Sequence, residues 1–196
     1  MKFQGDRFRV KPPDDSDQNT DDIACLAEIA RGDRAAFERL YRRYYDRLFR
    51  FVLRVTGRMN IAEDVINDTM MVIWRKAGEY RAAAKASTWI FGIAYRKALK
   101  ALSRELRTAN NADEALEPGE APPPDRLDRE GVHAAIRQAV MLLPPEHRAV
   151  VDLTFFFNRS YEEVAQILDC PVGTVKSRMF HARAKLRPLL AQLIGD

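Results

Sequence analysis

The sequence has only two cysteines, Cys25 and Cys170, which lie far apart and form no Cys-x-x-Cys pair. This spacing indicates neither a disulfide framework nor a self-contained zinc site, and it suits a reducing compartment. No apolar run is long enough to span a bilayer, and residues 1–7 lack the apolar segment of a signal peptide. We therefore expect a soluble, cytoplasmic protein without membrane insertion.

Catalytic motifs are also missing. The sequence contains no nucleophile–base pair, no metal-ligand cluster and no Gly-rich loop of the kind that holds phosphates. The three histidines, His133, His147 and His181, have no ligand spacing with one another or with the cysteines, so we interpret them as surface or DNA-facing residues. We expect no enzymatic activity, no metal and no cofactor.

What the chain does contain is helical patterning and clustered positive charge. Its 196 residues, 46% of them hydrophobic, suffice for one large or two small domains. The formal net charge of +4 is modest, but Arg and Lys gather in particular predicted helices, which makes nucleic acid a plausible partner. Apolar residues recur at intervals of three and four in segment after segment, which predicts an all-α fold.

Changes in composition divide the chain. Residues 1–21 are polar and acidic without sustained periodicity, and we predict a disordered tail. Residues 22–107 carry helical patterns and form the first predicted domain. Residues 108–125 are rich in proline, alanine and acidic side chains, which predicts a flexible linker. Residues 126–196 form a second small helical domain with a helix-turn-helix.

The helix-turn-helix pattern occupies residues 160–183. Ser160 and Glu163 form a capping box at the start of its first helix. Asp169 lies at the turn, where the left-handed region favours Gly but tolerates Asp, and Pro171 suits the first turn of the next helix. The pattern is typical of DNA-binding motifs, although an ordinary helical hairpin with solvated charges has the same spacing. The residues that face outward or flank the second helix are Thr174, Lys176, Ser177, Arg178, His181 and Arg183.

A second charged surface is acidic. The helix predicted from Asn60 to about Ala77 begins with a capping box of Asn60 and Glu63. Its outer carboxylates either stabilise the helix N-terminus by about 0.3–1 kcal/mol each, or join an exposed methionine to dock a basic helix of a partner. A metal-dependent nuclease using Asp64 and Asp68 is a further alternative, for which no third ligand is evident. The outer face consists of Glu63, Asp64, Asn67, Asp68 and Met71.

A third surface is a basic ridge on the helix predicted to begin with Ser87 as its cap and to end near Arg107. Basic side chains at intervals of three and four suit a phosphate backbone. Trp89, Phe91 and Tyr95 interleave with the ridge, and exposed aromatic rings stack unpaired bases for about 1–3 kcal/mol each. The alternative is a solvated charged face over a core tryptophan. The ridge consists of Arg96, Lys100, Ser103, Arg104 and Arg107.

Taken in order, these motifs resemble the extracytoplasmic-function (ECF) sigma factors of bacterial RNA polymerase, the sigma-E-like group 4 of the sigma-70 family. Residues 62–75, AEDVINDTMMVIWR, resemble the region that docks on the beta-prime clamp helices. Residues 87–94, STWIFGIA, with the basic ridge, resemble the region that melts and reads the minus-ten element. Residues 143–148, LPPEHR, and residues 160–186 resemble the domain that reads the minus-thirty-five element.

The resemblance covers residues 22–190 except the linker, and it implies an alternative sigma factor that directs transcription initiation in a stress or envelope response. Residues 22–107 would be sigma domain 2 and residues 126–196 sigma domain 4. The implied partners are promoter DNA and core RNA polymerase, through its beta-prime clamp helices and its beta flap. An anti-sigma factor is a common partner in the family, and the residues leave open whether one binds here or the acidic tail takes its place. A stand-alone helix-turn-helix regulator, which would leave the acidic face unexplained, is the rival interpretation.

The resemblance also implies roles for individual residues. The acidic outer face would bind core polymerase. The loop before Trp89 resembles one that captures a flipped base, whose extrusion costs a few kcal/mol. The implied minus-ten residues are Arg81, Lys85, Ser87, Trp89, Tyr95, Arg96, Lys100, Ser103 and Arg104. The implied minus-thirty-five residues are Arg148, Arg159, Tyr161, Thr174, Lys176, Ser177, Arg178, Phe180, His181 and Arg183, of which the first three would contact phosphates.

Overall fold

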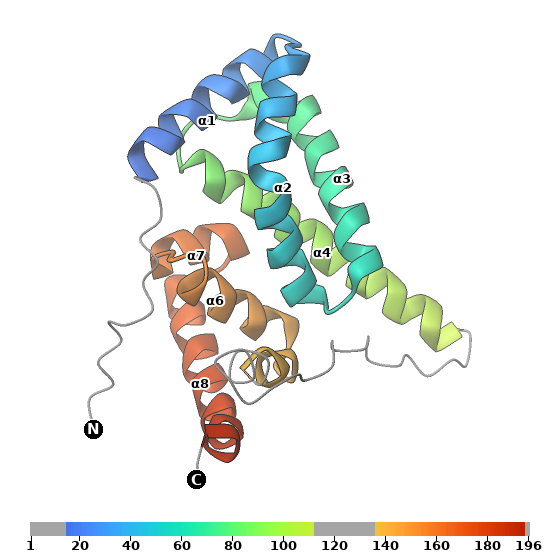
Figure 1. The fold of residues 1–196 in the computed structure, drawn as a ribbon, viewed down its shortest axis with the longest axis vertical. Coiled ribbons are helices and arrows are strands. Elements are labelled where there is room, and N and C mark those ends of the chain that lie inside the picture. The colour runs from blue at the N-terminus through green and yellow to red at the C-terminus, as the bar shows by residue number, and fades with distance from the viewer. Residues whose placement is uncertain (1–14, 112–135, 195–196) are drawn as a thin grey trace.

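The structure, a computed structural model, describes residues 15–111 and 136–194 (Figure 1). All regular structure in these residues is helical, so the all-α prediction is confirmed for them. None of the described helices is long and apolar enough to cross a membrane. The helices are α1 (Asp15–Ala30), α2 (Arg34–Thr56), α3 (Met59–Lys76), the 3-10 turn η1 (Ala77–Glu79), α4 (Ala86–Asn111), a short helix over residues 136–141, α6 (Pro145–Phe155), α7 (Tyr161–Leu168) and α8 (Val172–Ile194).

Helix α2 is the centre of the amino-terminal half, which comprises α1 to α4. Asp33 caps it, because its carboxylate accepts the backbone N–H groups of Ala35 and Ala36 at 2.8 and 3.0 Å. Gly57 ends it in the left-handed region, with φ of 74°. Helices α1, α3 and α4 pack around α2. The residues that α2 buries are Ala36, Leu40, Tyr44, Leu48, Phe51, Val52, Val55 and Thr56.

Part of the predicted disordered tail is helical. Residues 15–21 form the first turns of α1, which contradicts the prediction for these positions. Two polar contacts hold α1 in place: the Asn19 side chain accepts the backbone N–H of Ala86 at 2.9 Å, and the buried Asp22 carboxylate is hydrogen-bonded to α2. These contacts offset the entropy lost when the segment is ordered. Residues 1–14 of the predicted tail lie outside the described residues.

The predicted start of α3 is also wrong. The helix begins at Met59, and Arg58 occupies the N-cap position without a side-chain cap, so Asn60 and Glu63 form no capping box. Arg58 has extended backbone, with φ of −134°, and its Nε lies 3.1 Å from Glu105 Oε2 on α4. Helix α3 therefore begins next to a contact with α4 and has no local side-chain cap.

The start of α4 differs from the prediction in the same way. The helix begins at Ala86 and ends at Asn111 instead of near Arg107. Ser87 is therefore inside the first turn and is not the cap. Its buried hydroxyl accepts a hydrogen bond from Arg159 at 3.0 Å. The Asn19 side chain of α1 accepts the backbone N–H of Ala86, the first residue of α4. Two segments distant in sequence thus complete this helix terminus.

The helix-turn-helix prediction is confirmed in its local geometry. The Ser160 hydroxyl accepts the Glu163 N–H at 3.2 Å, and the Glu163 carboxylate accepts the Ser160 N–H at 3.0 Å. Asp169 has φ of 52° and ψ of 54°, which is the left-handed conformation expected at the turn. Pro171 directly precedes α8, and its carbonyl accepts the N–H of Thr174 at 2.9 Å. The inward residues of α8 are Val175, Met179 and Ala182, all buried.

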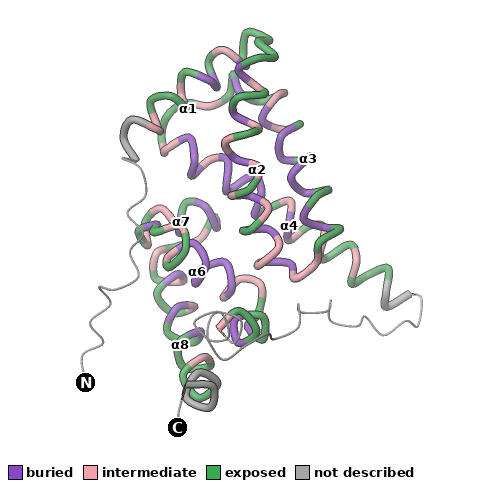
Figure 2. Tube along the Cα trace, viewed as in Figure 1, coloured by how far each residue is buried: buried purple, intermediate pink, exposed green. Residues whose placement is uncertain are grey.

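The carboxy-terminal half, residues 136–194, packs directly against the amino-terminal half. Helix α7 lies against α4 and α6 lies against α2, and the buried residues form one continuous core (Figure 2). Phe157, in the turn between α6 and α7, contacts the buried rings of Phe51 and Phe91 with centroid distances of 6.0 and 4.9 Å. The linker predicted at residues 108–125 lies outside the described residues beyond its first four positions, and its flexibility stays a prediction.

A buried ion pair joins the same two halves. The guanidinium of Arg54 on α2 donates to Asp152 on α6, and Asp152 is fully buried. Arg54 also lies 4.0 Å from the ring centroid of Phe156. The second oxygen of Asp152 has no hydrogen-bond partner among the described residues. Burial raises the pKa of Asp152 to about 7, against the opposing attraction of Arg54.

The left-handed turn residue provides a stability test. Asp169→Gly removes a Cβ from a backbone with positive φ, so we expect the free energy of unfolding to rise by up to about 1 kcal/mol. Asp169→Ala keeps the Cβ and loses the polar side chain that eases this conformation, so it should be less stable than the Gly variant. Urea unfolding of the three chains measures both differences. A Gly variant less stable than the unsubstituted chain would contradict the prediction.

The buried carboxyl group provides a pH test. Between its ordinary pKa of about 3.9 and its raised value, Asp152 binds a proton in the folded state and releases it on unfolding. Its contribution to stability therefore falls as the pH rises from about 4 to about 7 and is constant above that range. Asp152→Asn has no such titration. We expect the stability of the unsubstituted chain, measured relative to this variant, to decline over that range, and a difference that stays flat or increases would contradict the assignment.

Candidate polymerase and nucleic-acid interfaces

The acidic outer face of α3 is open to solvent. All five predicted residues, Glu63, Asp64, Asn67, Asp68 and Met71, are exposed, because the opposite side of α3 packs into the core. Asp68 has a partner, since its Oδ2 lies 3.0 Å from Lys97 Nζ on α4. The described residues contain no group of three or more His, Cys, Asp or Glu side chains placed to hold a metal ion. This face therefore presents three carboxylates, one of them paired with Lys97, next to a methionine that is 46% exposed.

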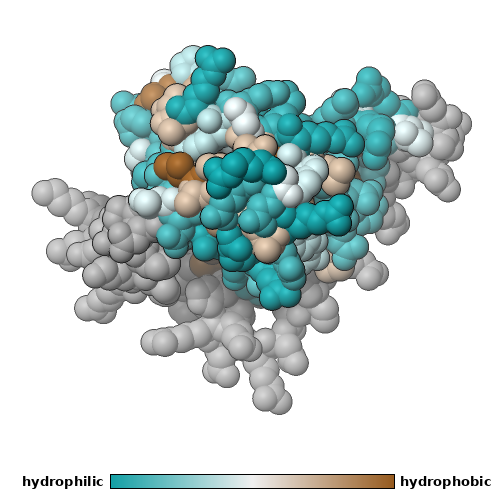
Figure 3. All heavy atoms as spheres, turned by 90° about the horizontal axis from the view of Figure 1, so that it is seen from above, coloured by the Kyte–Doolittle hydropathy of each residue, from teal (hydrophilic) through white to brown (hydrophobic). Residues whose placement is uncertain are grey.

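The basic ridge follows the carboxyl-terminal part of α4. Arg96, Lys100, Ser103 and Arg104 are all exposed, as is Arg107 at the end of the predicted ridge. The Arg107 side chain also folds back, since its Nε donates to the Ser103 carbonyl at 3.2 Å. The structure thus groups the predicted ridge residues on accessible turns of one helix. The end of the molecule that is seen from above in Figure 3 is also predominantly hydrophilic, with small hydrophobic areas.

The aromatic residues near the start of α4 do not form the exposed stacking surface that we predicted. Phe91 is fully buried and Tyr95 is 3% exposed, because both lie beneath the carboxy-terminal half. Burial raises the pKa of Tyr95 to about 12, against the nearby positive charge of Arg178 on α8. Trp89 is half-buried and packs on Tyr80 with ring centroids 5.5 Å apart.

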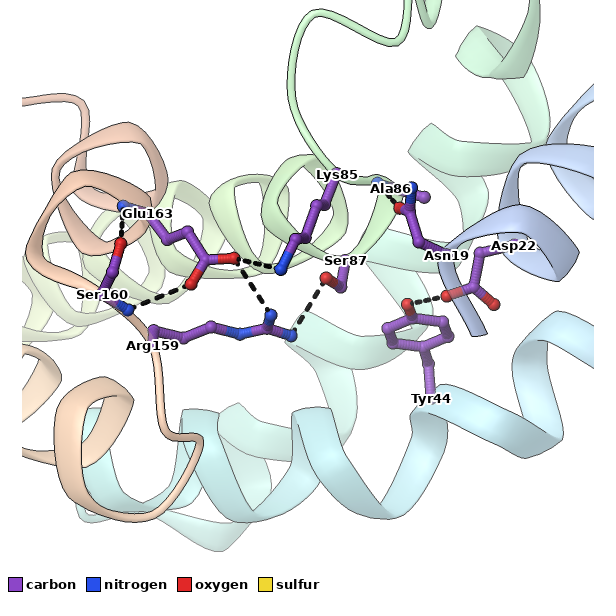
Figure 4. Close-up of polar contacts among 9 residues, drawn as sticks. All are labelled: Asn19, Asp22, Tyr44, Lys85, Ala86, Ser87, Arg159, Ser160 and Glu163. Atoms are coloured by element: carbon purple, nitrogen blue, oxygen red, sulfur yellow. Dashed lines mark hydrogen bonds and ion pairs between the residues drawn. The ribbon is translucent and has the colours of Figure 1, made fainter. Parts of the chain in front are cut away.

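The predicted base-capture loop is partly covered. Arg81 is exposed, but Lys85 is half-buried and Ser87 is 6% exposed. Lys85 Nζ lies 2.9 Å from a carboxylate oxygen of Glu163, and the Ser87 hydroxyl is bonded to Arg159 (Figure 4). Both contacts come from the carboxy-terminal half. Ser87, an implied minus-ten residue, is therefore covered in this arrangement.

The recognition helix α8 presents most of its predicted residues to solvent. Lys176, Ser177, His181 and Arg183 are exposed, and Phe180 has 70% of its surface accessible. Thr174, Arg178 and, on α7, Tyr161 are half-buried. The Arg178 guanidinium lies 3.9 Å from the Cys170 sulfur, on the side that faces α4.

Two predicted phosphate contacts are buried instead. Arg148 is 9% exposed and Arg159 is 5% exposed. Arg148 donates to the Arg54 carbonyl at 3.4 Å, and Arg159 lies between Ser87 and Glu163. Both guanidinium groups are directed at the amino-terminal half, which sequence periodicity does not reveal. As described, they are not placed to reach DNA.

Sequence reasoning missed the groups that join the halves. Asp152 and Phe157 were assigned no role, although a charged residue inside the apolar run AVVDL is a signal that could have been noticed. The histidines were treated as unrelated, but the structure brings two together: the rings of His147 and His181 are 6.4 Å apart. His133 lies outside the described residues.

Two family profiles match the chain. The profile described as Sigma-70 region 2 matches residues 40–108, which include most of α2, all of α3 and most of α4. The profile described as Sigma-70, region 4 matches residues 133–186, which include the helix-turn-helix.

Relatives match nearly the whole length. The RNA polymerase sigma-H factor of Pseudomonas aeruginosa is 30% identical over 187 residues, covering 89% of this chain and 96% of that protein. The ECF RNA polymerase sigma factor SigM of Mycobacterium tuberculosis is 34% identical over 172 residues, covering 88% of this chain and 86% of that protein.

Solved structures agree with the sequence relatives. The sigma factor RpoE of Bartonella quintana, in complex with the anti-sigma factor NepR, has a TM-score of 0.67 at 25% identity and covers 79% of this chain and 96% of its own. CnrH, in complex with the cytosolic domain of CnrY, has a TM-score of 0.63 at 25% identity and covers 88% and 98%. The chain belongs to the extracytoplasmic-function sigma factors of bacterial RNA polymerase, which direct transcription initiation and are not themselves enzymes.

Proposed function

We propose that this chain recruits core polymerase through the acidic face of α3 and reads a promoter with separated minus-ten and minus-thirty-five elements. The observation that supports this proposal is the presence of two exposed basic surfaces, on α4 and on α8, together with one exposed acidic face. Basic side chains on separate helices suit two stretches of nucleic acid, and the acidic face suits a basic protein surface. We place this activity in the cytoplasm and in a stress or envelope response.

We assign the surfaces as follows. The acidic face of α3 contacts the beta-prime clamp helices. The ridge of α4 and the loop around Lys85 bind the melted minus-ten element, and the exposed residues of α8 enter the major groove of the minus-thirty-five element. The beta flap is the expected contact of the carboxy-terminal half. Because the two solved relatives are bound to an anti-sigma factor or to a partner's cytosolic domain, we include an inhibitory protein among the partners.

The first test is transcription from a genomic DNA library by bacterial core RNA polymerase, with and without the purified protein. We expect new start sites that share two upstream motifs.

Asp64→Arg should abolish both the new starts and the binding of core polymerase, because it reverses charge in the centre of the acidic face. Asp46→Arg, at an exposed position on α2, is the matched control. Normal holoenzyme formation by Asp64→Arg would contradict the docking assignment. No new starts from the unsubstituted chain, with specific duplex binding by the protein alone, would favour a stand-alone regulator.

The assignment of α8 has its own test. If Arg178 makes a good base contact, Arg178→Ala should weaken discrimination between promoter variants by about 1–3 kcal/mol. Arg187→Ala removes an exposed Arg from a later turn of α8, outside the predicted DNA contacts, and should leave discrimination unchanged. Run-off transcription from promoters with single substitutions in the minus-thirty-five element measures both. Equal discrimination by the two variants would remove Arg178 from the base-reading set.

A further inference from the structure

Two histidines from different helices meet beside the recognition helix. Helix α6 packs against α8 within the carboxy-terminal half (Figure 1). His147 lies in the first turn of α6 and His181 in the middle of α8. Their rings form a T-shaped pair, with centroids 6.4 Å apart and planes at 66°. The packing of α6 on α8, and not a local motif, therefore creates this pair.

The two rings line an open hollow between the helices. Its volume is about 390 Å³. A water molecule occupies about 30 Å³ in the liquid, so the hollow has room for a small tetrahedral anion with several waters. Lys185 is exposed and makes no ion pair within the part of the chain that the structure describes. The lining residues are Leu143, Pro144, His147, His181, Ala184 and Lys185.

The two nitrogen atoms of His147 have different surroundings. Nδ1 is buried and has no hydrogen-bond partner among the described residues. An enclosed N–H without an acceptor is costly, so the neutral ring should carry its proton on Nε2. Because His147 as a whole is only half-buried, Nε2 is the nitrogen that a ligand in the hollow can reach. The ring therefore offers this ligand a donor.

The charges around the hollow are mainly positive. Burial lowers the pKa of His147, and so does the positive charge of Arg178 on α8. The His181 ring and Lys185, also on α8, lower this pKa further, whereas the carboxylate of Glu146 on α6 raises it. Neighbouring cations repel one another, and an anion placed between them would relieve that repulsion. The hollow thus favours a negatively charged ligand.

We propose that the hollow between α6 and α8 is a phosphate-binding site, in which His147, His181 and Lys185 contact the phosphate oxygens. A phosphate group has several acceptor oxygens that point in different directions, which suits separate donors from two helices. A planar carboxylate is better matched by the fork of one guanidinium. Arg178, the nearest guanidinium, lies 3.9 Å from the Cys170 sulfur.

Two sources can supply this phosphate group. One is the backbone of DNA that lies along α8, and this source rests on the proposed function. The other is a free phosphorylated compound, which would place negative charge next to His181, a predicted minus-thirty-five residue. The same residues would bind the phosphate in either case, so the site itself is tested first and its source second.

The site is tested by NMR of the histidine side chains in the full chain, titrated with inorganic phosphate at constant ionic strength. The signals are assigned with the variants His147→Gln and His181→Gln. We expect the signals of both rings to shift and to reach saturation, with a rise in the pKa of His147, because an anion favours the charged imidazole. Shifts that never saturate would indicate general ionic effects and would overturn the site.

A matched pair of variants locates the phosphate. Lys185→Ala should weaken phosphate binding several-fold. Arg187→Ala removes the same charge from an exposed position that does not line the hollow, and it should leave the affinity unchanged. Both substitutions are at exposed positions of α8, so neither removes a core contact. Equal phosphate affinities in the two variants would overturn the assignment of the site to this hollow.

The histidine contacts have a separate test with sulfate, which keeps its charge over the pH range in which histidines titrate. Sulfate should bind more tightly as the pH falls through the ordinary histidine pKa of about 6.5, because protonated rings attract an anion more strongly. His181→Gln, at an exposed position, should reduce this dependence. A sulfate affinity that does not change with pH would overturn the histidine contacts.

The source is identified with a fluorescent DNA duplex of mixed sequence, bound over a range of salt concentrations. If a DNA phosphate occupies the hollow, the slope of log K against log salt should be smaller by about 1 in Lys185→Ala than in Arg187→Ala. Equal slopes, together with saturable phosphate binding, would assign the site to a free phosphorylated compound. None of these readouts uses polymerase, so a failure to find new start sites would contradict the proposed function and leave the phosphate site intact.

Discussion

The start of α4 is the point on which the described arrangement depends. Its first amide donates to Asn19 of α1, its first-turn hydroxyl accepts from Arg159 of the other half, and Lys85 just before it pairs with Glu163 of α7. Free N–H groups at a helix start must find partners, and the N–H of Ala86 finds its partner on α1, far away in sequence. Because α1, α4 and α7 meet there, the position of the carboxy-terminal half is linked to the conformation of the predicted base-capture loop.

The distribution of charge follows from this packing. Groups at the interface are paired or enclosed, as with Asp152 and Arg54, whereas the charges of α3 and α8 stay in solvent. An enclosed charge is costly without its partner, and an exposed charge is available for long-range attraction. The same chain therefore carries one set of charged residues that hold the halves together and another set suited to partners. Arg148 and Arg159 belong to the first set in this arrangement, although their residue type suggested the second.

Local signals in the sequence were reliable where the structure depends on neighbours within one or two turns. The capping box of Ser160 and Glu163 and the left-handed Asp169 follow from short-range hydrogen bonding and backbone sterics, and both are observed. The exposed acidic residues of α3 follow from its apolar inner face. The predicted capping box at Asn60 failed because the helix begins at Met59, where contact with α4 replaces a local cap. Residues 15–21 were predicted to be disordered because they are polar and acidic. The prediction failed because the groups that they contact lie on α2 and at the start of α4, which are distant in sequence.

The sequence by itself determined the helical class, the helix-turn-helix, the sigma-factor family and the residues that are exposed on α3 and α8. It could do so because periodicity, caps and motif order are properties of nearby residues. Only the tertiary structure decided that Ser87, Tyr95, Arg148 and Arg159 are buried. Ser87 and Arg159 are 72 positions apart and Arg54 and Asp152 are 98 apart, so no local pattern relates them. Their burial depends on how α4 and α2 pack against α7 and α6, because packing of distant segments decides which polar side chains of an amphipathic helix lose contact with water.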